Sequence, residues 1–343
     1  MTEKLSIILL NFHGLADTIE CLDSLRAADL GAARVLLLDN GSGVTEAEAL
    51  MAWNETTGFF GETVKINKQA ALGAGTRVHT LLLSEVNHGF AGGNNLATRL
   101  ALAAGDEEVL LLNNDTTVTP GFLTALLAAR ARHPNAALIP QIRLHARPYR
   151  MWNCGGELRF PGRKVYHYEN APVASLPADG DFPVSFVTGC ALLYRPALTG
   201  LLTERFFFGE EDMEFSLRLR RLGLPALCVT GSVIYHKVGT TLKSTHRKSE
   251  IFTLKRLINL RHNVGRGELA AAYGYYLINL LRLDLFRYRR SPRAALRTLR
   301  RVWRDARRLD GVGETLSVGY VRGGEYDAGE ASSPKVNAKL PRA

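Results

Sequence analysis

The chain has 343 residues, of which 46% are hydrophobic and 22% charged, and it includes 32 glycines, 13 prolines and 4 cysteines. This composition is typical of a soluble globular protein and excludes a disordered or fibrous one. Single hydrophobic cores stop growing at roughly 250 to 300 residues, so the length predicts a main domain with an appended unit.

The cysteines show neither a CxxC pair nor the Cys/His spacing of a zinc site. We therefore expect buried free thiols rather than a disulfide framework or a structural metal. The first residues lack the pattern of a secretory signal. The longest apolar run, Leu269 to Leu281, is too short to span a bilayer, which needs roughly 18 or more apolar residues. These features predict a cytoplasmic protein.

The net charge of +10 is concentrated late in the chain. Residues 1–242 carry 21 basic and 24 acidic residues, whereas residues 243–308 carry 18 basic and 4 acidic residues. A basic patch this localised argues against a protein that coats nucleic acid over its whole surface. No groove-reading motif or aromatic stacking stripe accompanies the charge, and we expect no nucleic-acid partner.

Short apolar runs alternate with helical periodicity along the first two thirds of the chain. The expected strands cover residues 5–10, 35–38, 81–85, 109–112, 184–193 and 226–235. The expected helices cover residues 17–28 with Asp17 as the N-cap, a segment from about Asn94, residues 120–132, residues 212–223, and most of residues 243–309. This order predicts an α/β fold with a mainly parallel sheet and helices on both faces.

Two regions give no clear pattern, and the end of the chain gives a weak one. Residues 59–75 form a Gly-rich polar insert that we do not assign, and residues 140–190 are rich in Pro, Gly and aromatic side chains without periodicity. Residues 310–343 are expected to be a loosely ordered tail.

Polar residues follow several of the expected strands, and the most prominent are Asn11, Asp39 and Asp115. In open α/β sheets ligands bind outside the carboxyl ends of the strands, so these side chains should converge. Asp115 follows two amides, and a carboxylate there could hold Mg²⁺ or Mn²⁺ together with substrate phosphates. The alternative is a simple turn, because the sequence Asn-Asn-Asp is common after strands. His236, at the end of another expected strand, could serve as a further metal ligand or as a structural histidine.

Three adjacent carboxylates, Glu210, Glu211 and Asp212, stand at the entrance of an expected helix. They repel one another unless a cation or the positive end of the helix offsets their charge, which favours a functional site. The alternative is acidic capping of the first helical turn, which would explain Asp212 alone. The Gly-rich run at residues 87–95 lacks the spacing of a dinucleotide or P-loop motif, yet its backbone could approach an anionic ligand.

The joint order of these motifs closely resembles glycosyltransferase family 2, of GT-A fold, and its bacterial rhamnosyltransferase-like members. The resemblance covers roughly residues 4–242. The matching positions are Asn11, Asp39-Asn40-Gly41-Ser42, Gly89 to Asn95, Leu112 to Asp115, Thr188-Gly189, Phe208 to Asp212, and His236.

The resemblance implies a role for each matched residue. Asp39 would read the imide edge of a uracil or thymine base with help from Asn11, and Asp212 would be the catalytic base with Glu211 supporting the site. The donor would also lie against Gly92, Gly93, Asn94, Asn114 and Gly189. Asp115 would be the last residue of a DxD-type metal motif whose first acid is replaced by Asn113, and His236 would complete a Mg²⁺ or Mn²⁺ site.

The resemblance therefore implies an inverting glycosyltransferase that uses a dTDP- or UDP-linked sugar, rhamnose among the candidates. The acceptor would be a glycan or lipid-linked molecule of the cell envelope. Residues 1–242 would form the transferase domain, and residues 243–309 a basic amphipathic helical region that contacts the inner face of the membrane or is simply solvated. A catalytically inactive module that binds nucleotide sugars or glycans stays open as the alternative.

Overall fold

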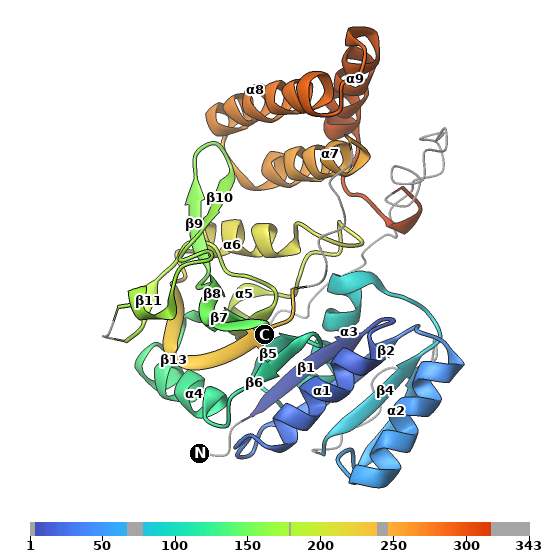
Figure 1. Cartoon of the computed structure of the whole chain (residues 1–343), viewed down its shortest axis with the longest axis vertical. Coiled ribbons are helices and arrows are strands. Elements are labelled where there is room, and N and C mark those ends of the chain that lie inside the picture. The colour runs from blue at the N-terminus through green and yellow to red at the C-terminus, as the bar shows by residue number, and fades with distance from the viewer. Residues whose placement is uncertain (1–3, 67–77, 178–179, 239–245, 317–343) are drawn as a thin grey trace. The chain divides into compact units, whose positions relative to one another are not determined.

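The computed structural model of the protein describes residues 4–66, 78–177, 180–238 and 246–316 (Figure 1). Residues 317–343, which make up most of the expected tail, lie outside the described residues, as does the part of the polar insert from residue 67 onward. The predicted α/β architecture with a mainly parallel central sheet is confirmed. In the part of the chain that the structure describes, we find no helix with the length and apolarity needed to cross a membrane.

The strands occupy the first 236 residues. They are β1 (Leu5–Asn11), β2 (Arg34–Asn40), β3 (Glu62–Ile66), β4 (Thr80–Ser84), β5 (Glu108–Asn113), β6 (Thr116–Val118), β7 (Ala137–Leu144), β8 (Arg147–Asn153), β9 (Gly156–Arg159), β10 (Arg163–Tyr166), β11 (Phe182–Pro183), β12 (Ala191–Tyr194) and β13 (Ala226–His236).

The helices lie between these strands and after them. They are α1 (Leu15–Arg26), α2 (Val44–Thr57), α3 (Gly89–Ala103), α4 (Phe122–Arg132), the 3₁₀ turn η1 (Val173–Ser175), α5 (Pro196–Thr199), α6 (Glu211–Leu222), α7 (His246–Asn263), α8 (Arg266–Arg282), the π-helical turn η2 (Leu283–Arg287) and α9 (Pro292–Arg308).

The main sheet has the strand order β11-β13-β7-β12-β5-β1-β2-β4-β3, with β6 paired to β13 and β8 paired to β7. The neighbours from β5 to β3 are parallel, β12 is antiparallel to both of its neighbours, and β7 and β13 are parallel. Strands β9 and β10 form a separate hairpin. The parallel pairs place the carboxyl ends of β1, β2 and β5 at one edge.

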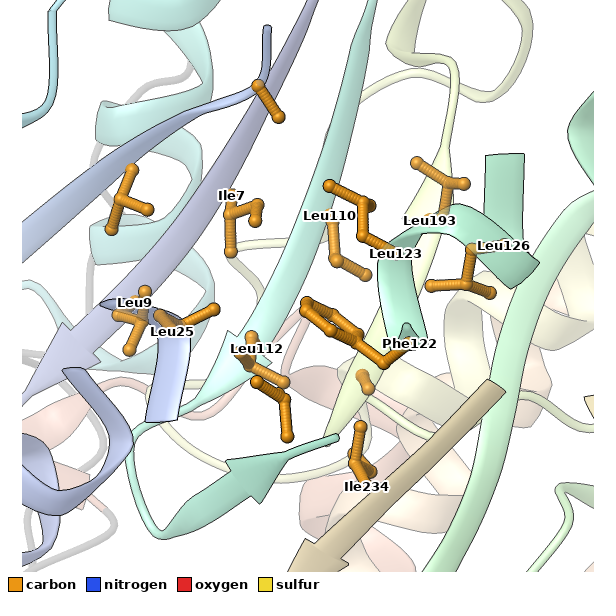
Figure 2. Packing of buried hydrophobic residues seen from close by; sticks show 14 of the residues in the cluster. Ile7, Leu9, Leu25, Leu110, Leu112, Phe122, Leu123, Leu126, Leu193 and Ile234 are labelled. Atoms are coloured by element: carbon orange, nitrogen blue, oxygen red, sulfur yellow. The ribbon is translucent and has the colours of Figure 1, made fainter. Parts of the chain in front are cut away.

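Successive side chains of each strand point to opposite faces of the sheet, so the hydrophobic core is divided between the two faces. Ile7 and Leu9 of β1 pack with α1, α2 and α4 on one face, whereas Ile8 packs with α3 and α6 on the other (Figure 2 shows part of the first cluster). Burying one such aliphatic side chain stabilises the fold by about 1.5 to 3 kcal/mol. Because both faces are covered, the strands read as continuous apolar runs.

Several predicted boundaries were wrong for identifiable reasons. Helix α3 begins at Gly89 rather than near Asn94, because the side chain of Asn40 bonds the N–H of His88 and the carbonyl of Gly89 and so fixes the first turn. Asp17 lies in the first turn of α1 and bonds Lys237 Nζ at 2.6 Å, while Gly14 occupies the N-cap.

The expected strand at residues 184–193 is interrupted, and only its last residues belong to β12. The backbone leaves the sheet after Pro183, where β11 ends, and the N–H of Val187 donates instead to Ser216 Oγ of α6 at 3.0 Å. Helix α2 and strands β3 and β6 to β10 were not predicted. Strand β7 gave no alternating signal because six of its eight residues are buried. The four cysteines are free and buried, as predicted.

Contacts between residues group into two compact units, Met1–Glu204 with Phe208–Leu242, and Arg205–Phe207 with Lys243–Ala343. In the second unit, α7, α8 and α9 pack on one another around Leu254, Leu257 and Leu280. Arg256 is buried and donates to the hydroxyl of Tyr276 at 3.0 Å. Helix α9 starts with a favourable cap, because Ser291 Oγ accepts from the N–H of Ala294.

Candidate functional site

The ends of β1 and β2 carry a buried network of polar side chains. The amide of Asn11 donates to Asp39 Oδ1 at 2.9 Å, to Glu46 Oε2 at 3.0 Å and to Ser42 Oγ at 3.2 Å. Burial raises the pKa of Asp39, although hydrogen bonds from Ser42 and Asn11 oppose the shift. Asp39 is only 1% exposed, so a ligand must displace part of this network before it can bond to the carboxylate.

Asn114 belongs to the same network through a single intermediate. Its amide donates to Thr18 Oγ1 at 2.8 Å, and that hydroxyl donates to Asn11 Oδ1 at 2.8 Å. The end of β5 is thereby tied to the end of β1. The structure thus brings together, in one hydrogen-bonded group, three of the residues predicted to bind the nucleotide-sugar donor: Asn11, Asp39 and Asn114.

The Gly-rich segment lies within the first two turns of α3 rather than in a turn before it. A Cβ at Gly93 would come within 2.5 Å of Leu10 Cδ1 and 3.3 Å of the Asn40 amide, so glycine permits the close approach of α3 to the sheet. Asn94 is buried and donates to the carbonyl of Phe90. At Gly92, which follows Ala91 in the first turn, a Cβ would meet His88 Cβ at 3.3 Å.

Gly189 lies beside this helix, between β11 and β12. A Cβ at Gly189 would lie 3.5 Å from the ring of Phe90, which is ordinary contact. Gly93 therefore has a packing role whatever its part in donor binding, whereas the space around Gly189 does not by itself require glycine.

Asp115 and His236 form a pair although 121 positions separate them in the chain. Asp115 follows β5 and His236 ends β13, and the antiparallel pairing of β13 with β6 brings them together. Their closest atoms, Asp115 Oδ2 and His236 Nε2, are 3.1 Å apart. Asp115 Oδ1 and His236 Nδ1 are buried and have no hydrogen-bond partner among the described residues.

The pair could supply two ligands to a divalent cation. Among the residues that the structure describes, no group of three or more His, Cys, Asp and Glu side chains could hold a metal ion. Mg²⁺ and Mn²⁺, however, often take one or two protein carboxylates and share substrate phosphates. An unpartnered carboxylate oxygen beside an imidazole nitrogen therefore fits a divalent cation whose other ligands come from substrate and water.

Helix α6 presents the acidic cluster, and its entrance has an unusual backbone. Gly209 and Glu210 both have positive φ, 84° and 81°, so a non-glycine residue holds a left-handed conformation at the N-cap. Such a conformation costs on the order of 1 to 3 kcal/mol and is found most often at functional sites. This left-handed conformation at Glu210 leads the chain from the loop into the first turn of α6, which contains Glu211 and Asp212.

The two acids of that turn have different surroundings. Glu211 is 5% exposed, its Oε2 is buried without a partner in the described part of the chain, and burial together with the charge of Asp212 raises its pKa to about 7. Asp212 is partly exposed, and its Oδ2 lies 3.4 Å from Lys164 Nζ. Burial lowers the pKa of Lys164, but the charges of Asp212 and Tyr166 outweigh it, so that the pKa is raised overall.

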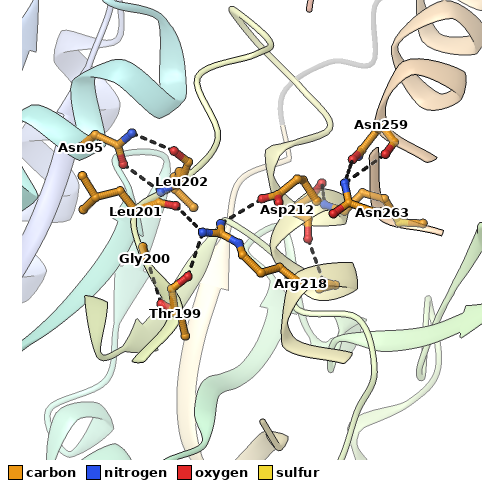
Figure 3. Close-up of polar contacts among 12 residues, drawn as sticks. Asn95, Thr199, Gly200, Leu201, Leu202, Asp212, Arg218, Asn259 and Asn263 are labelled. Carbon is orange, nitrogen blue, oxygen red and sulfur yellow. Dashed lines mark hydrogen bonds and ion pairs between the residues drawn. The ribbon is translucent and has the colours of Figure 1, made fainter. Parts of the chain in front are cut away.

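Helix α6 is held in place from the side by Arg218 (Figure 3). Its guanidinium donates to the carbonyls of Thr199 at 2.8 Å and Leu201 at 2.7 Å, and it pairs with Glu214 at 2.9 Å. The next residue, Leu202, exchanges two hydrogen bonds with the side chain of Asn95 on α3. The acidic turn is therefore fixed relative to the Gly-rich helix.

A continuous series of contacts joins the Asp115–His236 pair to Asp212. The ring centroids of His236 and Trp152 are 4.3 Å apart, and those of Trp152 and Tyr166 are 6.1 Å apart. The ammonium of Lys164 lies 5.1 Å from the Tyr166 ring and 3.4 Å from Asp212. No hydrogen bond or ion pair between described residues joins Asp212 directly to Asp115 or Asp39.

Sequence reasoning missed the three linking residues Trp152, Lys164 and Tyr166. They come from β8 and β10, inside the region that shows no periodicity, and no local motif marks them. Thr18 and Glu46 were missed as well, although they complete the network around Asn11.

Comparisons with known proteins agree with this geometry at the level of the fold. No family model matches the sequence. Uncharacterized proteins from Mycobacterium bovis and Mycobacterium tuberculosis are 52% identical over 44 residues, which is 13% of this chain and 17% of each of theirs.

Two solved structures resemble the chain over most of its length. A mannosyltransferase from Pyrobaculum calidifontis in complex with GDP-Man and Mn²⁺ has a TM-score of 0.51 and 13% identity, over 94% of this chain and 79% of that one. GalNAc-T7 with UDP, GalNAc and Mn²⁺ has a TM-score of 0.52 and 13% identity, over 79% of this chain and 54% of that one.

The match to TarS of S. aureus has a TM-score of 0.47 and covers 44% of that chain. Across these comparisons, the chain therefore spans about half or less of several of the proteins that it matches. The two higher-scoring structures show that the chain has the glycosyltransferase fold of GT-A type, as the resemblance implied.

Proposed function

We propose that this chain transfers a sugar from a nucleoside diphosphate to a hydroxyl group, with inversion at the anomeric carbon, as a member of glycosyltransferase family 2. The observation that carries the proposal is the contact series from Asp115 and His236 through Trp152 to Lys164 and Asp212. In this proposal, the diphosphate would bind at one end of the series and the carboxylate at the other end would act on the acceptor. The glycosyltransferase fold and the Mn²⁺ in two similar structures support the same reaction.

The donor end would use Asp115 and His236 to hold Mn²⁺ or Mg²⁺. A bound cation would neutralise the charge that develops on the leaving diphosphate, an effect worth several kcal/mol. Asn11, Asp39 and Asn114 would hold the nucleoside, with Gly92, Gly93, Asn94 and Gly189 beside it. Trp152 would position His236, because its ring packs against the imidazole at 4.3 Å.

The acceptor end would use Asp212 as the general base. Its carboxylate would take the proton of the acceptor hydroxyl while the new C–O bond forms and the bond to the diphosphate oxygen breaks. A positioned base of this kind contributes roughly 10² to 10⁴ in rate. Glu211, whose pKa of about 7 leaves much of it protonated at neutral pH, would donate a hydrogen bond to the acceptor or to the turn itself.

A single displacement with the base on the face opposite the leaving group inverts the configuration. We extend the proposal to a dTDP- or UDP-linked donor, rhamnose among the candidates, and to a glycan or lipid-linked acceptor of the cell envelope. In this account, residues 1–242 are the transferase domain and act in the cytoplasm.

The basic helical region, residues 243–309, would contact the inner face of the membrane. In the second unit, Ile278 is 61% exposed and Phe286 is 78% exposed, and arginines at 282 and 287 stand close to them in the sequence. Exposed apolar side chains among arginines are the pattern of a helix that lies on an anionic surface. Each arginine near such a surface contributes about 1 kcal/mol.

The test is release of the nucleoside diphosphate from UDP- and dTDP-sugars in the presence of Mn²⁺, with the anomeric configuration of any product assigned by NMR. The proposal predicts metal-dependent release that stops when Asp212 is replaced by Asn. As a control, Asp23→Asn changes an exposed carboxylate of α1 and should leave release unchanged.

The alternative, an inactive module that binds nucleotide sugars, is supported by Asn113 in place of the first acid of the metal motif. It predicts that the same sugars raise the melting temperature without any release of diphosphate. That combination of results would contradict the proposed transfer reaction.

A further inference from the structure

An open cavity of about 290 Å³ lies among α7, α8 and α9 in the second unit, and none of the residues that line it belongs to the proposed transferase site. Leu269 and Tyr273 stand four positions apart on α8, and Trp303 and Arg307 stand four positions apart on α9. Residues at this spacing share one face of a helix, so each helix presents an adjacent pair to the cavity. Arg261, from the last turn of α7, completes the lining.

One polar group of this cavity is a buried hydroxyl that has no partner in the part of the chain that the structure describes. This is the hydroxyl of Tyr273. Burial raises the pKa of Tyr273, and the nearby charges of Arg261 and Arg307 offset only part of the shift. The hydroxyl is therefore protonated at neutral pH, and it can donate to a ligand that displaces the side chains covering it. Buried polar groups in folded proteins are nearly always bonded, so an unpaired one calls for an explanation.

The guanidinium groups of Arg261 and Arg307 line the same cavity. Arg261 donates to the carbonyls of Ala306 at 2.9 Å and Leu309 at 2.6 Å, and it pairs with the exposed Asp310 at 2.9 Å. The guanidinium of Arg307 lies over the ring of Trp303, 4.5 Å from its centroid. The orientation of Arg261 is set by these hydrogen bonds, so little of its side-chain entropy is lost when a ligand binds.

The remaining wall is apolar and consists of the indole of Trp303 and the side chain of Leu269. Trp303 is 47% exposed, so the cavity can be reached from solvent. A ligand that fits has an anionic end for the arginines and Tyr273, and an apolar or ring-shaped end for the indole. Three donor side chains that line one cavity match the terminal oxygens of a phosphate better than the two oxygens of a carboxylate. At roughly 30 Å³ per water, the volume holds a phosphate with a short chain or one ring.

We propose that this cavity is a binding site for a phosphate ester, with the phosphate bonded to Tyr273, Arg261 and Arg307 and the ester group packed on Trp303. The site is independent of the proposed transferase reaction, because none of its residues takes part in that reaction. The ester could be a lipid headgroup or a sugar phosphate, and both present the same phosphate chemistry.

Calorimetric titration of the full chain tests the site with four probes: octyl phosphate, glucose 1-phosphate, inorganic phosphate and neutral octyl glucoside. Octyl phosphate or glucose 1-phosphate should bind at least tenfold more tightly than inorganic phosphate, because only the esters contact Trp303. Preference for the octyl ester would indicate a lipid source, and preference for the glucosyl ester a sugar phosphate. Equal binding of octyl phosphate and octyl glucoside, or no binding of either ester, would overturn the proposal.

Three variants distinguish binding in this cavity from nonspecific attraction of a phosphate ester to the basic helices. Arg307→Gln should weaken ester binding about tenfold, and Tyr273→Phe about fivefold, whereas Arg297→Gln on another face of α9 should leave it unchanged. Tyr273→Phe removes a buried donor that lacks an acceptor, so without ligand its melting temperature should equal or exceed that of the original chain. Equal losses in the Arg297 and Arg307 variants would show diffuse attraction and overturn the assignment.

Discussion

Replacing Glu211 by Gln should make the protein more stable at alkaline pH. Glu211 is 5% exposed, and burial raises its pKa from 4.5 to about 7, with the neighbouring charge of Asp212 adding to the effect. The folded state therefore binds a proton more tightly than the unfolded state does. Stability from this group is present in full below pH 4.5 and is lost as the pH rises toward 7 and above.

The magnitude follows from the size of the shift. At 1.36 kcal/mol for each pKa unit, ionisation of Glu211 in the folded chain costs about 3 kcal/mol of unfolding free energy by pH 8. Glutamine is neutral and nearly isosteric, so the Glu211→Gln variant avoids this cost. At pH 8 the variant should be more stable than the original chain by about 3 kcal/mol, and at pH 4.5 the two should differ by less than about 1 kcal/mol.

Urea unfolding at pH 4.5, 6 and 8 measures the difference between the two chains at each pH. The matched control is Glu157→Gln, in which an exposed glutamate paired with Arg159 loses its charge. This control should change stability by about 0.5 kcal/mol or less at every pH. A difference between the Glu211→Gln variant and the original chain that does not depend on pH would refute the reasoning.

Four further predictions concern core packing, the two ends of the proposed site, and membrane contact by the second unit. Gly93→Ala should destabilise the fold by about 1 to 3 kcal/mol, because the added Cβ would meet Leu10 at 2.5 Å. The control Gly267→Ala, where a Cβ meets nothing within 4 Å, should be neutral or stabilising. Urea unfolding measures the stability of both variants. His236→Ala should weaken Mn²⁺ binding about 10- to 100-fold by calorimetry, and His145→Ala, a more exposed histidine, should not. Lys164→Met removes the ammonium 3.4 Å from Asp212 and should lower turnover about tenfold with unchanged donor affinity in steady-state assays. Phe286→Ala should reduce sedimentation with anionic vesicles about tenfold relative to the original chain, since burial of a phenylalanine contributes about 1.5 to 3 kcal/mol, and Leu198→Ala in the first unit should have no such effect.

The sequence predicted the parallel half of the sheet well because its signals are local. Strands β1, β2, β4 and β5 are unbroken apolar runs that end in polar residues, and such runs form buried parallel strands. The contact of Asp39 with Asn11 follows from the same pattern, because parallel neighbours place equivalent ends side by side.

The other half of the sheet could not be predicted in the same way. Most of its strands are short or interrupted by β-bulges, and their order depends on pairings between distant segments, such as the parallel pairing of β13 with β7 and the antiparallel pairing of β12 with β5. Trp152 comes to lie beside His236 because β8 pairs with β7 and β7 with β13, whereas Lys164 and Tyr166 come from the separate β9–β10 hairpin. The start of α3 was missed for a related reason, since a bond from Asn40, about 50 positions earlier, sets it.

In the proposed reaction, Asp115 and His236 act at the donor end and Asp212 at the acceptor end. Turnover and Mn²⁺–UDP affinity, measured together in Asp212→Asn, test it most directly. We predict that affinity stays within about twofold while turnover falls by roughly 10² to 10⁴. Full turnover in the Asp212→Asn variant would contradict the account.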